Sequence, residues 1–540
     1  MRDMAEQFDK IKGRVAGGPR RRFTWGQLLA PVAIVAVLGA ALATSPTRAP
    51  WTAPPQLTAA GEQLHYLPFD AQQFYDTLKS EYTPLPAENM RLISSIVPSR
   101  AGNTVAIDHW EDGYDADPIN NPSATTEVST MGEGEVQVLN NVIVLANIGD
   151  ITPGGSSQPY YDGRDKIVST SPTVVTTGGW GNSTGSVHAG ASAVPEVSRY
   201  GYAFESPVGE GTPFPSGNAA ASPWEYTGLI VAASQDGTTV NVTGEAPITL
   251  DEGDVHLVDG GINVGDDITA DKPIAVYLAT GDVGAGFEGR LFELTPTERW
   301  TDTYFSPVTS TNNSARVTRA FLFNPGNAAI TVNVTRSNST STTVSVPAGG
   351  QASYLFPSDV GAKFQSTGNP FYALQVVTTP EVGNDSSASW NWGFSLIPQA
   401  YLTPMVVLGY ATGSSNLTEN DSAVWIAPAG ATTIYIDRDG DTATGANTDA
   451  NGNKYDFSCA MNALRPRVIA DDGTTTCHVP SAFTNAKGGG DGDMTGARIY
   501  TLDGTALAAA WGQVPGLNAS NPAIDMGTTV LPFPTVDLNK

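Results

Sequence analysis

Residues 433–456, TIYIDRDGDTATGANTDANGNKYD, hold closely spaced oxygen-bearing side chains that could bind a metal ion. They fall into two alternating sets: Asp437, Asp439 and Asp441, followed by Asp449, Asn451 and Asn453. Calcium prefers six to eight oxygen ligands, and carboxylates within one turn repel each other unless a cation or solvent separates them. The spacing predicts a calcium loop that includes both sets. The alternative is a solvated polar turn between two strands.

The kind of calcium loop can be narrowed from the sequence. An EF-hand loop counted from Asp437 requires glycine at its sixth position and glutamate at its twelfth. This chain has Thr442 and Thr448 there, which excludes an EF-hand. The two short sets resemble the Asp-rich calcium loops of thrombospondin type 3 repeats. That resemblance implies a calcium ion that braces the loop and takes no part in catalysis.

A second acidic cluster lies in IDHWEDGYDADP, residues 107–118. It follows the strand-like segment TVAID as the first cluster follows TIYID, so we expect a second cation site with Asp108 and Asp112 among its ligands. Carboxylates beside Trp110 and Tyr114 also suit glycan hydrolysis, which uses a pair of carboxyl groups. A secreted carbohydrate-active enzyme using Asp108 and Glu111 is therefore the alternative function.

The N-terminal region predicts export. Residues 1–22 form a basic segment with seven Lys or Arg and three Asp or Glu. Residues 23–43 form an apolar stretch about 20 residues long, enough to span a bilayer as a transmembrane or signal helix. Basic residues precede it, so we expect the rest of the chain outside the cytoplasm, at the cell surface or secreted. If uncleaved, the helix anchors the protein in the membrane.

The chain contains two cysteines, Cys459 and Cys477, 18 residues apart. In an exported protein an even cysteine count favours one disulfide bond. Closing a loop of this size stabilises a fold by about 3 kcal/mol in the chain-entropy model. Two buried free thiols are the alternative.

The rest of the chain is predicted to be all-β and repetitive. Alternating Val, Ile and Thr segments lie between Gly- and Asp-rich turns. SRYGYAFESPV (198–208) aligns with ERWTDTYFSPV (298–308), and TVNVT recurs at 239–243 and 331–335. We therefore predict tandem β-sandwich-like units of about 100 residues, with a β-propeller-like arrangement as the alternative. The predicted boundaries are a Pro/Thr/Ala-rich linker with a short helix (44–85) and four β units (86–197, 198–297, 298–395 and 396–540, the last holding the acidic loop).

Two groups of segments carry a family resemblance. The succession LIVAASQDGTTVNV, ITLDEGDVHLV and ITADKPIAVYLATG resembles the N-terminal region of IgGFc-binding proteins and related bacterial surface adhesins. DHWEDGYDAD and GARIYTLDGTALAAAWGQ resemble segments of large bacterial envelope proteins. Together they span most of residues 90–515. The resemblance implies an extracellular β-repeat module for adhesion or matrix binding, without catalytic residues.

Charge and motifs complete the functional expectation. The formal net charge is −26, which argues against a nucleic-acid partner because phosphate binding needs Lys and Arg. We expect an exported, non-enzymatic envelope protein that binds an extracellular protein or glycan. Besides the carbohydrate-active enzyme, a surface-layer or filament subunit remains an alternative.

Overall fold

The computed structural model describes residues 62–73, 90–143, 161–181, 189–210, 212, 224–281, 290–311, 317–378, 390–411, 422–484, 488–514 and 526–533. The predicted basic segment 1–22 and apolar segment 23–43 lie outside these residues. Within them, no helix has the length and apolar character needed to span a membrane. The prediction of an all-β chain is confirmed, since strands and short 3-10 turns make up nearly all the regular structure of the described residues, with one helical turn at residues 71–73.

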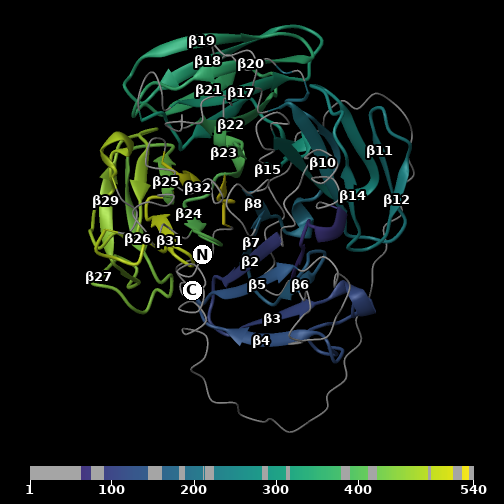
Figure 1. Cartoon of the computed structure of the whole chain (residues 1–540). Coiled ribbons are helices and arrows are strands. Elements are labelled where there is room, and N and C mark those ends of the chain that lie inside the picture. The colour runs from purple at the N-terminus through teal and green to yellow at the C-terminus, as the bar shows by residue number, and fades with distance from the viewer. Residues whose placement is uncertain are drawn as a thin grey trace.

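The strands fall into four consecutive groups, coloured in chain order in Figure 1. Group 1 contains β1 (Gln63–Tyr66), β2 (Met90–Pro98), β3 (Asn103–Asp108), β4 (Glu127–Met131), β5 (Gln137–Ile143), β6 (Lys166–Ser169), β7 (Thr173–Gly181) and β8 (Ala189–Val194). Group 2 contains β9 (Gly201–Glu205), β10 (Tyr226–Ala233), β11 (Thr238–Val242), β12 (Ile248–Leu250), β13 (Val255–Val258), β14 (Asp267–Gly281) and β15 (Arg290–Glu293).

Groups 3 and 4 complete the described chain. Group 3 contains β16 (Thr303–Ser306), β17 (Thr318–Asn324), β18 (Ile330–Arg336), β19 (Ser341–Val346), β20 (Gly350–Leu355), β21 (Ala362–Ser366), β22 (Tyr372–Thr378) and β23 (Trp390–Ser395). Group 4 contains β24 (Met405–Val407), β25 (Ser422–Pro428), β26 (Thr432–Asp437), β27 (Asn447–Thr448), β28 (Lys454–Tyr455), β29 (Phe457–Met461), β30 (Arg467–Ile469), β31 (Arg498–Thr501), β32 (Leu507–Gln513) and β33 (Gly527–Thr529). Short 3-10 turns lie at Trp110–Asp112, Val197–Arg199, Thr297–Arg299, Gln399–Tyr401 and Pro480–Ala482.

The same strand connectivity recurs in the groups. Group 1 forms two antiparallel sheets, in the orders β1-β6-β3-β4 and β5-β2-β7-β8. Group 3 forms β16-β21-β18-β19 and β20-β17-β22-β23, and group 4 forms β24-β31-β26-β29 and β30-β25-β32-β33. In group 2, the long strand β14 takes the place of both central strands, so one seven-stranded sheet covers both layers.

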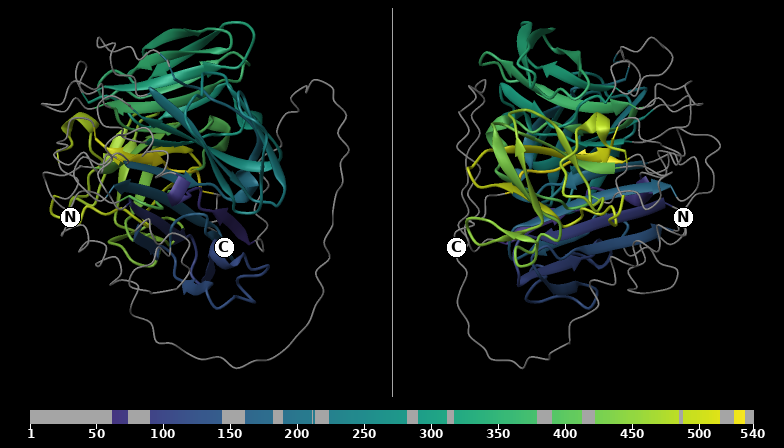
Figure 2. Two further views of the ribbon diagram at one scale, coloured as in Figure 1. Left: turned by 45° about the vertical axis from the view of Figure 1, so that its right-hand side comes forward. Right: turned by 90° about the vertical axis from the view of Figure 1, so that its left-hand side faces the viewer.

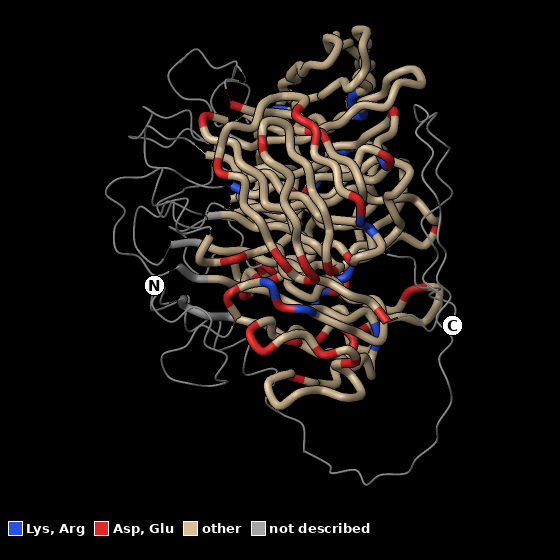
Figure 3. The backbone as a smooth tube through the Cα atoms, turned by 90° about the vertical axis from the view of Figure 1, so that its right-hand side faces the viewer, with Lys and Arg blue, Asp and Glu red and all other residues tan. Residues whose placement is uncertain are grey.

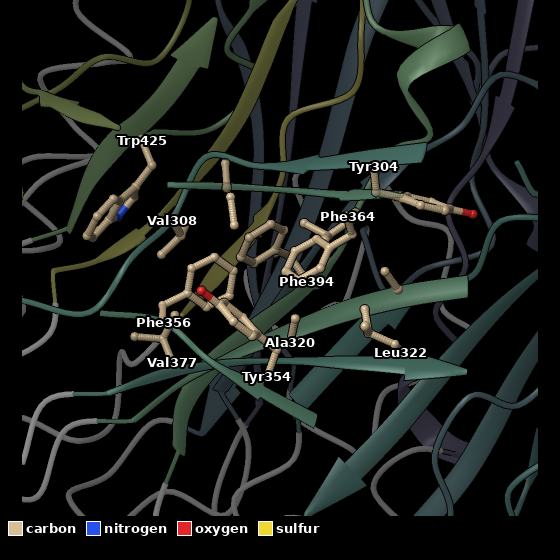
Figure 4. Close-up of a cluster of buried hydrophobic side chains, with 14 of the residues drawn as sticks. Tyr304, Val308, Ala320, Leu322, Tyr354, Phe356, Phe364, Val377, Phe394 and Trp425 are labelled. Atoms are coloured by element: carbon tan, nitrogen blue, oxygen red, sulfur yellow. The ribbon is translucent and has the colours of Figure 1, made fainter. Parts of the chain in front are cut away.

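Alternation of side chains places the core between the layers. In β18, Ile330, Val332 and Val334 are buried while the intervening residues face solvent, because successive side chains of a strand point to opposite faces. Aromatic side chains fill the space between the two sheets of group 3, where Tyr354 lies edge-on to Phe356 and Phe364 (Figure 4). Burial of such apolar area contributes about 25 cal/mol per Å² to folding.

The groups are arranged around a common centre. The last strand of each group faces that centre: β8 contacts β15, β15 contacts β23, β23 contacts β33, and β33 contacts β8. Figures 1 and 2 show the resulting ring, with group 4 returning to lie beside group 1. At the junction of groups 3 and 4, the fully buried Trp392 lies against two glycines; a Cβ at Gly512 would be 2.5 Å from its ring and one at Gly527 2.2 Å.

The two segments aligned in the sequence adopt the same local structure. Each has a 3-10 turn, Val197–Arg199 or Thr297–Arg299, followed by a strand. Ser206 Oγ donates to the carbonyl of Val208 at 2.5 Å, and Ser306 Oγ donates to the carbonyl of Val308 at 2.8 Å. The shared Ser-Pro-Val sequence therefore makes the same turn twice.

The structure differs from the predicted linker at residues 44–85. Residues 63–66 form β1, which pairs with β6 inside group 1, because His65 and Tyr66 are buried there and not in solvent. The predicted short helix begins after Asp70, whose carboxylate accepts the Gln73 N–H at 2.9 Å, as an N-cap does. The remainder of that helix lies outside the described residues.

Candidate metal centre

The first acidic set begins where β26 ends in group 4. Asp437 is the last residue of this strand, paired in register with Arg498 of β31. Its side chain has no solvent-exposed area, because β26 is a central strand of its sheet. Burying a charged carboxylate away from water costs folding free energy unless the charge is neutralised.

The loop after β26 turns back and brings three carboxylates together. Gly440 and Thr442 have positive φ values of 67° and 52°, which allow the tight turn. One carboxylate oxygen from each of Asp437, Asp439 and Asp441 lies within 4.8 Å of the others, and no other such group of three occurs among the described residues. Two oxygens bound to one calcium ion are at most about 5 Å apart, so this spacing fits a shared ion.

Hydrogen bonds within the loop leave one oxygen without a donor. Asp437 Oδ2 accepts the Thr442 N–H at 3.1 Å, whereas no donor in the described part of the chain reaches its buried Oδ1. Asp441 Oδ1 accepts the Thr444 N–H at 2.8 Å, and the Thr444 hydroxyl donates to Asp439. An unsatisfied buried oxygen costs about 1–3 kcal/mol, so Asp437 is the carboxylate of this loop that a bound cation would stabilise most.

The carboxyl groups of Asp437 and Asp439 have pKa shifts in opposite directions. Burial, together with the neighbouring Asp439 carboxyl group, raises the pKa of Asp437 to about 8. Partial burial also acts to raise the pKa of Asp439, but hydrogen bonds from Asp437 and Thr444 outweigh it and lower that pKa. The pair therefore holds one proton at neutral pH, and a bound cation would take the place of that proton.

The second acidic set is separate from the first. Asp449 accepts the N–H groups of Asn451 at 2.8 Å and Asn453 at 2.9 Å, and its other oxygen accepts the Tyr500 hydroxyl at 2.9 Å. These bonds close a turn between β27 and β28. Asp449 does not belong to the group of three carboxylates, because its oxygens accept hydrogen bonds from the hairpin and from Tyr500. This half of the segment forms a polar turn in the structure, and calcium binding by Asp449, Asn451 and Asn453 stays a prediction.

The cluster at residues 107–118 is organised differently. Asp108 is fully buried at the end of β3, and its oxygens accept the Asp115 N–H at 2.7 Å and the Thr126 hydroxyl at 3.2 Å. Asp112 accepts the Thr125 hydroxyl at 2.6 Å instead of joining Asp108 in a shared group of three carboxylates. Local donors therefore bond to both oxygens of Asp108 and to one oxygen of Asp112, and a cation at these residues stays a prediction.

The same cluster offers little to an acid–base reaction. Burial raises the pKa of Glu111 to about 7, and the charge of Asp162 adds to that shift. A pKa near 7 suits a general acid, but both carboxylate oxygens of Glu111 are buried. Asp108 and Glu111 therefore do not present a pair of carboxylates to solvent, as hydrolysis of a glycan requires.

Sequence reasoning missed two residues beside the metal centre, Glu133 and Arg498. Glu133, in the turn between β4 and β5 of group 1, accepts the Thr442 hydroxyl at 2.8 Å and pairs with Arg498. It lies 309 residues from Thr442 in the chain, so no local spacing could reveal the contact. The one available signal was the parallel between TVAID and TIYID, whose final aspartates both face a basic residue, Lys166 or Arg498.

The disulfide bond forms in the structure between Cys459 of β29 and Cys477. Both residues pack against the apolar core of group 4, which also contains Ile434 and Ile436 of β26. The bond therefore ties the long segment after β30 to the sheet that carries Asp437.

Comparisons with known proteins give no family. No family model matches the chain, and no curated protein matches it. A solved structure described as a tetra-tandem repeat in the extending region of a large adhesion protein aligns with 83% of this chain and 96% of its own, at 10% identity and a TM-score of 0.08. A likeness at this level supports no inference about fold or function.

Proposed function

We propose that the chain is an exported, non-enzymatic cell-envelope protein whose β groups form a calcium-braced surface for an extracellular protein or glycan. In this proposal the four strand groups are tandem copies of one β-sandwich. The calcium ion stabilises the end of β26, and the predicted N-terminal segment directs export and anchors the protein if it is uncleaved.

One observation carries the calcium part of the proposal. Asp437 is completely buried, one of its oxygens has no hydrogen-bond donor in the described chain, and it faces Asp439 and Asp441. Hard carboxylate oxygens in this number and spacing favour calcium over softer metals. Calcium sites of extracellular modules commonly have dissociation constants of about 0.1–1 mM, so a site of modest affinity suits an exported protein.

The surface and the disulfide support the location and the kind of partner. Acidic residues are spread over the face shown in Figure 3 and outnumber the Lys and Arg residues there, as they do in the whole sequence. Such a surface suits a soluble protein in contact with cations and disfavours nucleic acid. The Cys459–Cys477 bond suits an oxidising compartment.

A calcium titration tests the metal site. The full chain, purified in a mild non-ionic detergent, is melted first with chelator and then with increasing calcium chloride. We expect the melting temperature to rise with calcium, and to rise far less in the double variant Asp437→Asn/Asp439→Asn. Asp503→Asn is the matched control, because this aspartate caps a turn with Thr505 N–H at 3.0 Å outside the metal centre. An unchanged melting temperature up to 10 mM calcium, about the weakest range for such sites, contradicts the proposal.

Localisation is tested separately. Fractionation of cells producing the full chain should place it in the envelope or medium, accessible to an added protease. Intact chain found only in the cytoplasm contradicts export. Purified protein that binds components of an extracellular matrix or glycan panel supports the partner class, whereas glycan hydrolysis would favour the enzymatic alternative.

A further inference from the structure

The metal centre lies beside the junction that closes the ring. Consecutive groups are joined by the chain, through residues 195–200, 294–302 and 396–404. Groups 1 and 4 are the first and last in the sequence, so no linker of the kind that joins consecutive groups runs between their described residues, and noncovalent contacts hold them together. We call this junction the seam. Its apolar part contains Val97 and Val174 of group 1, packed with Met405, Val407 and Tyr500 of group 4.

Polar contacts join the seam to the metal loop. Glu133 of group 1 pairs with Arg498, the residue opposite Asp437 in the sheet. Its second oxygen accepts the hydroxyl of Thr442, whose N–H binds Asp437 at 3.1 Å. Arg498 also donates to the carbonyl of Ser99 at 3.2 Å, in group 1. Glu133 therefore contacts residues on both sides of the Asp437 carboxylate.

Backbone packing fixes the loop from the same side. A Cβ at Gly134 would lie 2.0 Å from the carbonyl oxygen of Asp439, and a Cβ at Gly440 would lie 3.4 Å from the Cα of Gly134. Gly134 has a positive φ of 68° and donates its N–H to Pro98 at 3.3 Å, so the β4–β5 turn is itself held in place. In the right-hand view of Figure 2, the loops of group 4 lie against the strands of group 1.

From these contacts we propose that Glu133 and Gly134 are positioning residues for the cation site, and that calcium binding there fastens groups 1 and 4 to each other. The inference rests on the proposed calcium function and adds its structural consequence. Among the described residues of group 1, none belongs to the group of three carboxylates. Group 1 holds the Asp437–Thr442 turn in the shape that brings the three carboxylates together. Asp437, buried and with one oxygen lacking a donor, is the independent sign that an ion belongs there.

The coupling has a consequence that can be measured at each end. If the closed seam favours the calcium-binding shape of the loop, calcium must favour the closed seam by the same factor. Calcium should therefore protect backbone amides of group 1, and substitutions in group 1 should weaken calcium binding. A purely structural role of Glu133 and Gly134 would lower stability and leave calcium affinity unchanged.

Isothermal titration of calcium chloride into the full, calcium-free chain tests the affinity arm. Gly134→Ala places a methyl group against the Asp439 carbonyl, and we expect calcium affinity to fall about 10-fold, within the usual range of coupling between sites. Gly102→Ala is the matched control: it has a similar positive φ of 74° in the same group, but no atom lies within 4 Å of the added methyl. We expect it to change affinity less than about 2-fold. Glu133→Gln is the second variant. It keeps the shape of the side chain, so it should fold even if Gly134→Ala does not, and we expect it to weaken calcium binding about 5-fold.

Hydrogen exchange with and without calcium tests the other arm. We expect calcium to slow exchange in the peptide covering residues 132–136 of group 1 as well as in residues 437–444. If the original chain binds calcium and the variants Gly134→Ala, Glu133→Gln and Gly102→Ala all bind it with the same affinity, the coupling is refuted. The calcium site itself would remain supported. Protection confined to residues 437–444 has the same meaning. Absence of calcium binding by the original chain refutes the site and the coupling together.

Discussion

Replacing Asp437 with asparagine should change stability in opposite directions with and without calcium. In the unfolded chain this carboxyl ionises near its ordinary pKa of 3.8, whereas burial raises the pKa in the folded chain to about 8. The folded state without calcium must therefore keep a proton at pH 7 that the unfolded state releases. At ~1.36 kcal/mol per pH unit, this costs the folded state about 4 kcal/mol. Solvent screening beside the exposed Asp439 reduces the cost to about 2 kcal/mol.

The asparagine side chain has nearly the same shape as that of aspartate, and it does not ionise in either the folded or the unfolded chain. Its amide can donate to Asp439 and its oxygen can accept the Thr442 N–H, so the variant avoids the ionisation cost. In chelator at pH 7 we expect Asp437→Asn to be more stable than the original chain by about 2 kcal/mol, or about 2 °C in melting temperature for a chain of this length. The gain should vanish near pH 4, because a raised carboxyl pKa removes stability only as the pH climbs from 3.8 towards 8.

Calcium should reverse this order. At a concentration 1,000 times its Kd, a bound ion stabilises the original chain by about 4 kcal/mol, and the variant lacks the ligand charge needed to bind it. The assay is thermal melting in chelator and in calcium, at pH 4.5 and pH 7, with Asp503→Asn as control. Loss of stability in chelator at pH 7 would refute the reasoning, because it would mean that the buried carboxylate is already neutralised by the protein.

Three further outcomes are expected. Burial lowers the pKa of His65 to about 4, so the chain should lose about 2 kcal/mol between pH 7 and pH 5, and His65→Asn should abolish that part of the loss in denaturant titrations; an unchanged pH profile would contradict it. Gly512→Ala should cost about 2 kcal/mol or more in denaturant unfolding because its methyl would meet the ring of Trp392 at 2.5 Å, whereas a neutral result would mean that the ring can move. Removing both Cys459 and Cys477 should lower stability by about 3 kcal/mol, measured against the original chain without reductant, and equal stability would rule out the disulfide in solution.

The parts of this structure that were predictable are those set by local pattern. Alternation of buried and exposed residues, as in Ile330–Arg336, is written in the sequence itself, and so the all-β class could be predicted. The alternating aspartates at 437–441 also lie together, because one tight turn is enough to gather them. Asp449 shows the limit of that logic: an Asp with Asn two and four residues later satisfies its own turn as readily as it binds a cation.

The parts that were not predictable depend on long-range register. Glu133 meets Arg498 across 365 residues of chain, and no local spacing connects the two residues. Gln63–Tyr66 follows a Pro- and Thr-rich stretch, so its sequence indicates a spacer. In the structure it forms the edge strand of a sheet, paired with β6, which lies about a hundred residues further along the chain. Such pairings follow from the closure of sheets and of the ring, and spacing within one segment carries no information about them.

The single strand β14 has a consequence for how force and local opening are distributed. In groups 1, 3 and 4, separate central strands serve the two layers, so one layer can fray while the other persists. In group 2, Asp267–Gly281 crosses both layers as one continuous backbone, paired with β11 and β9 at one end and with β10 and β15 at the other. Pulling on either layer therefore loads the same strand, and its hydrogen bonds must shear together. Group 2 should behave as a mechanically stiff segment of the ring, with its two layers losing structure in one step.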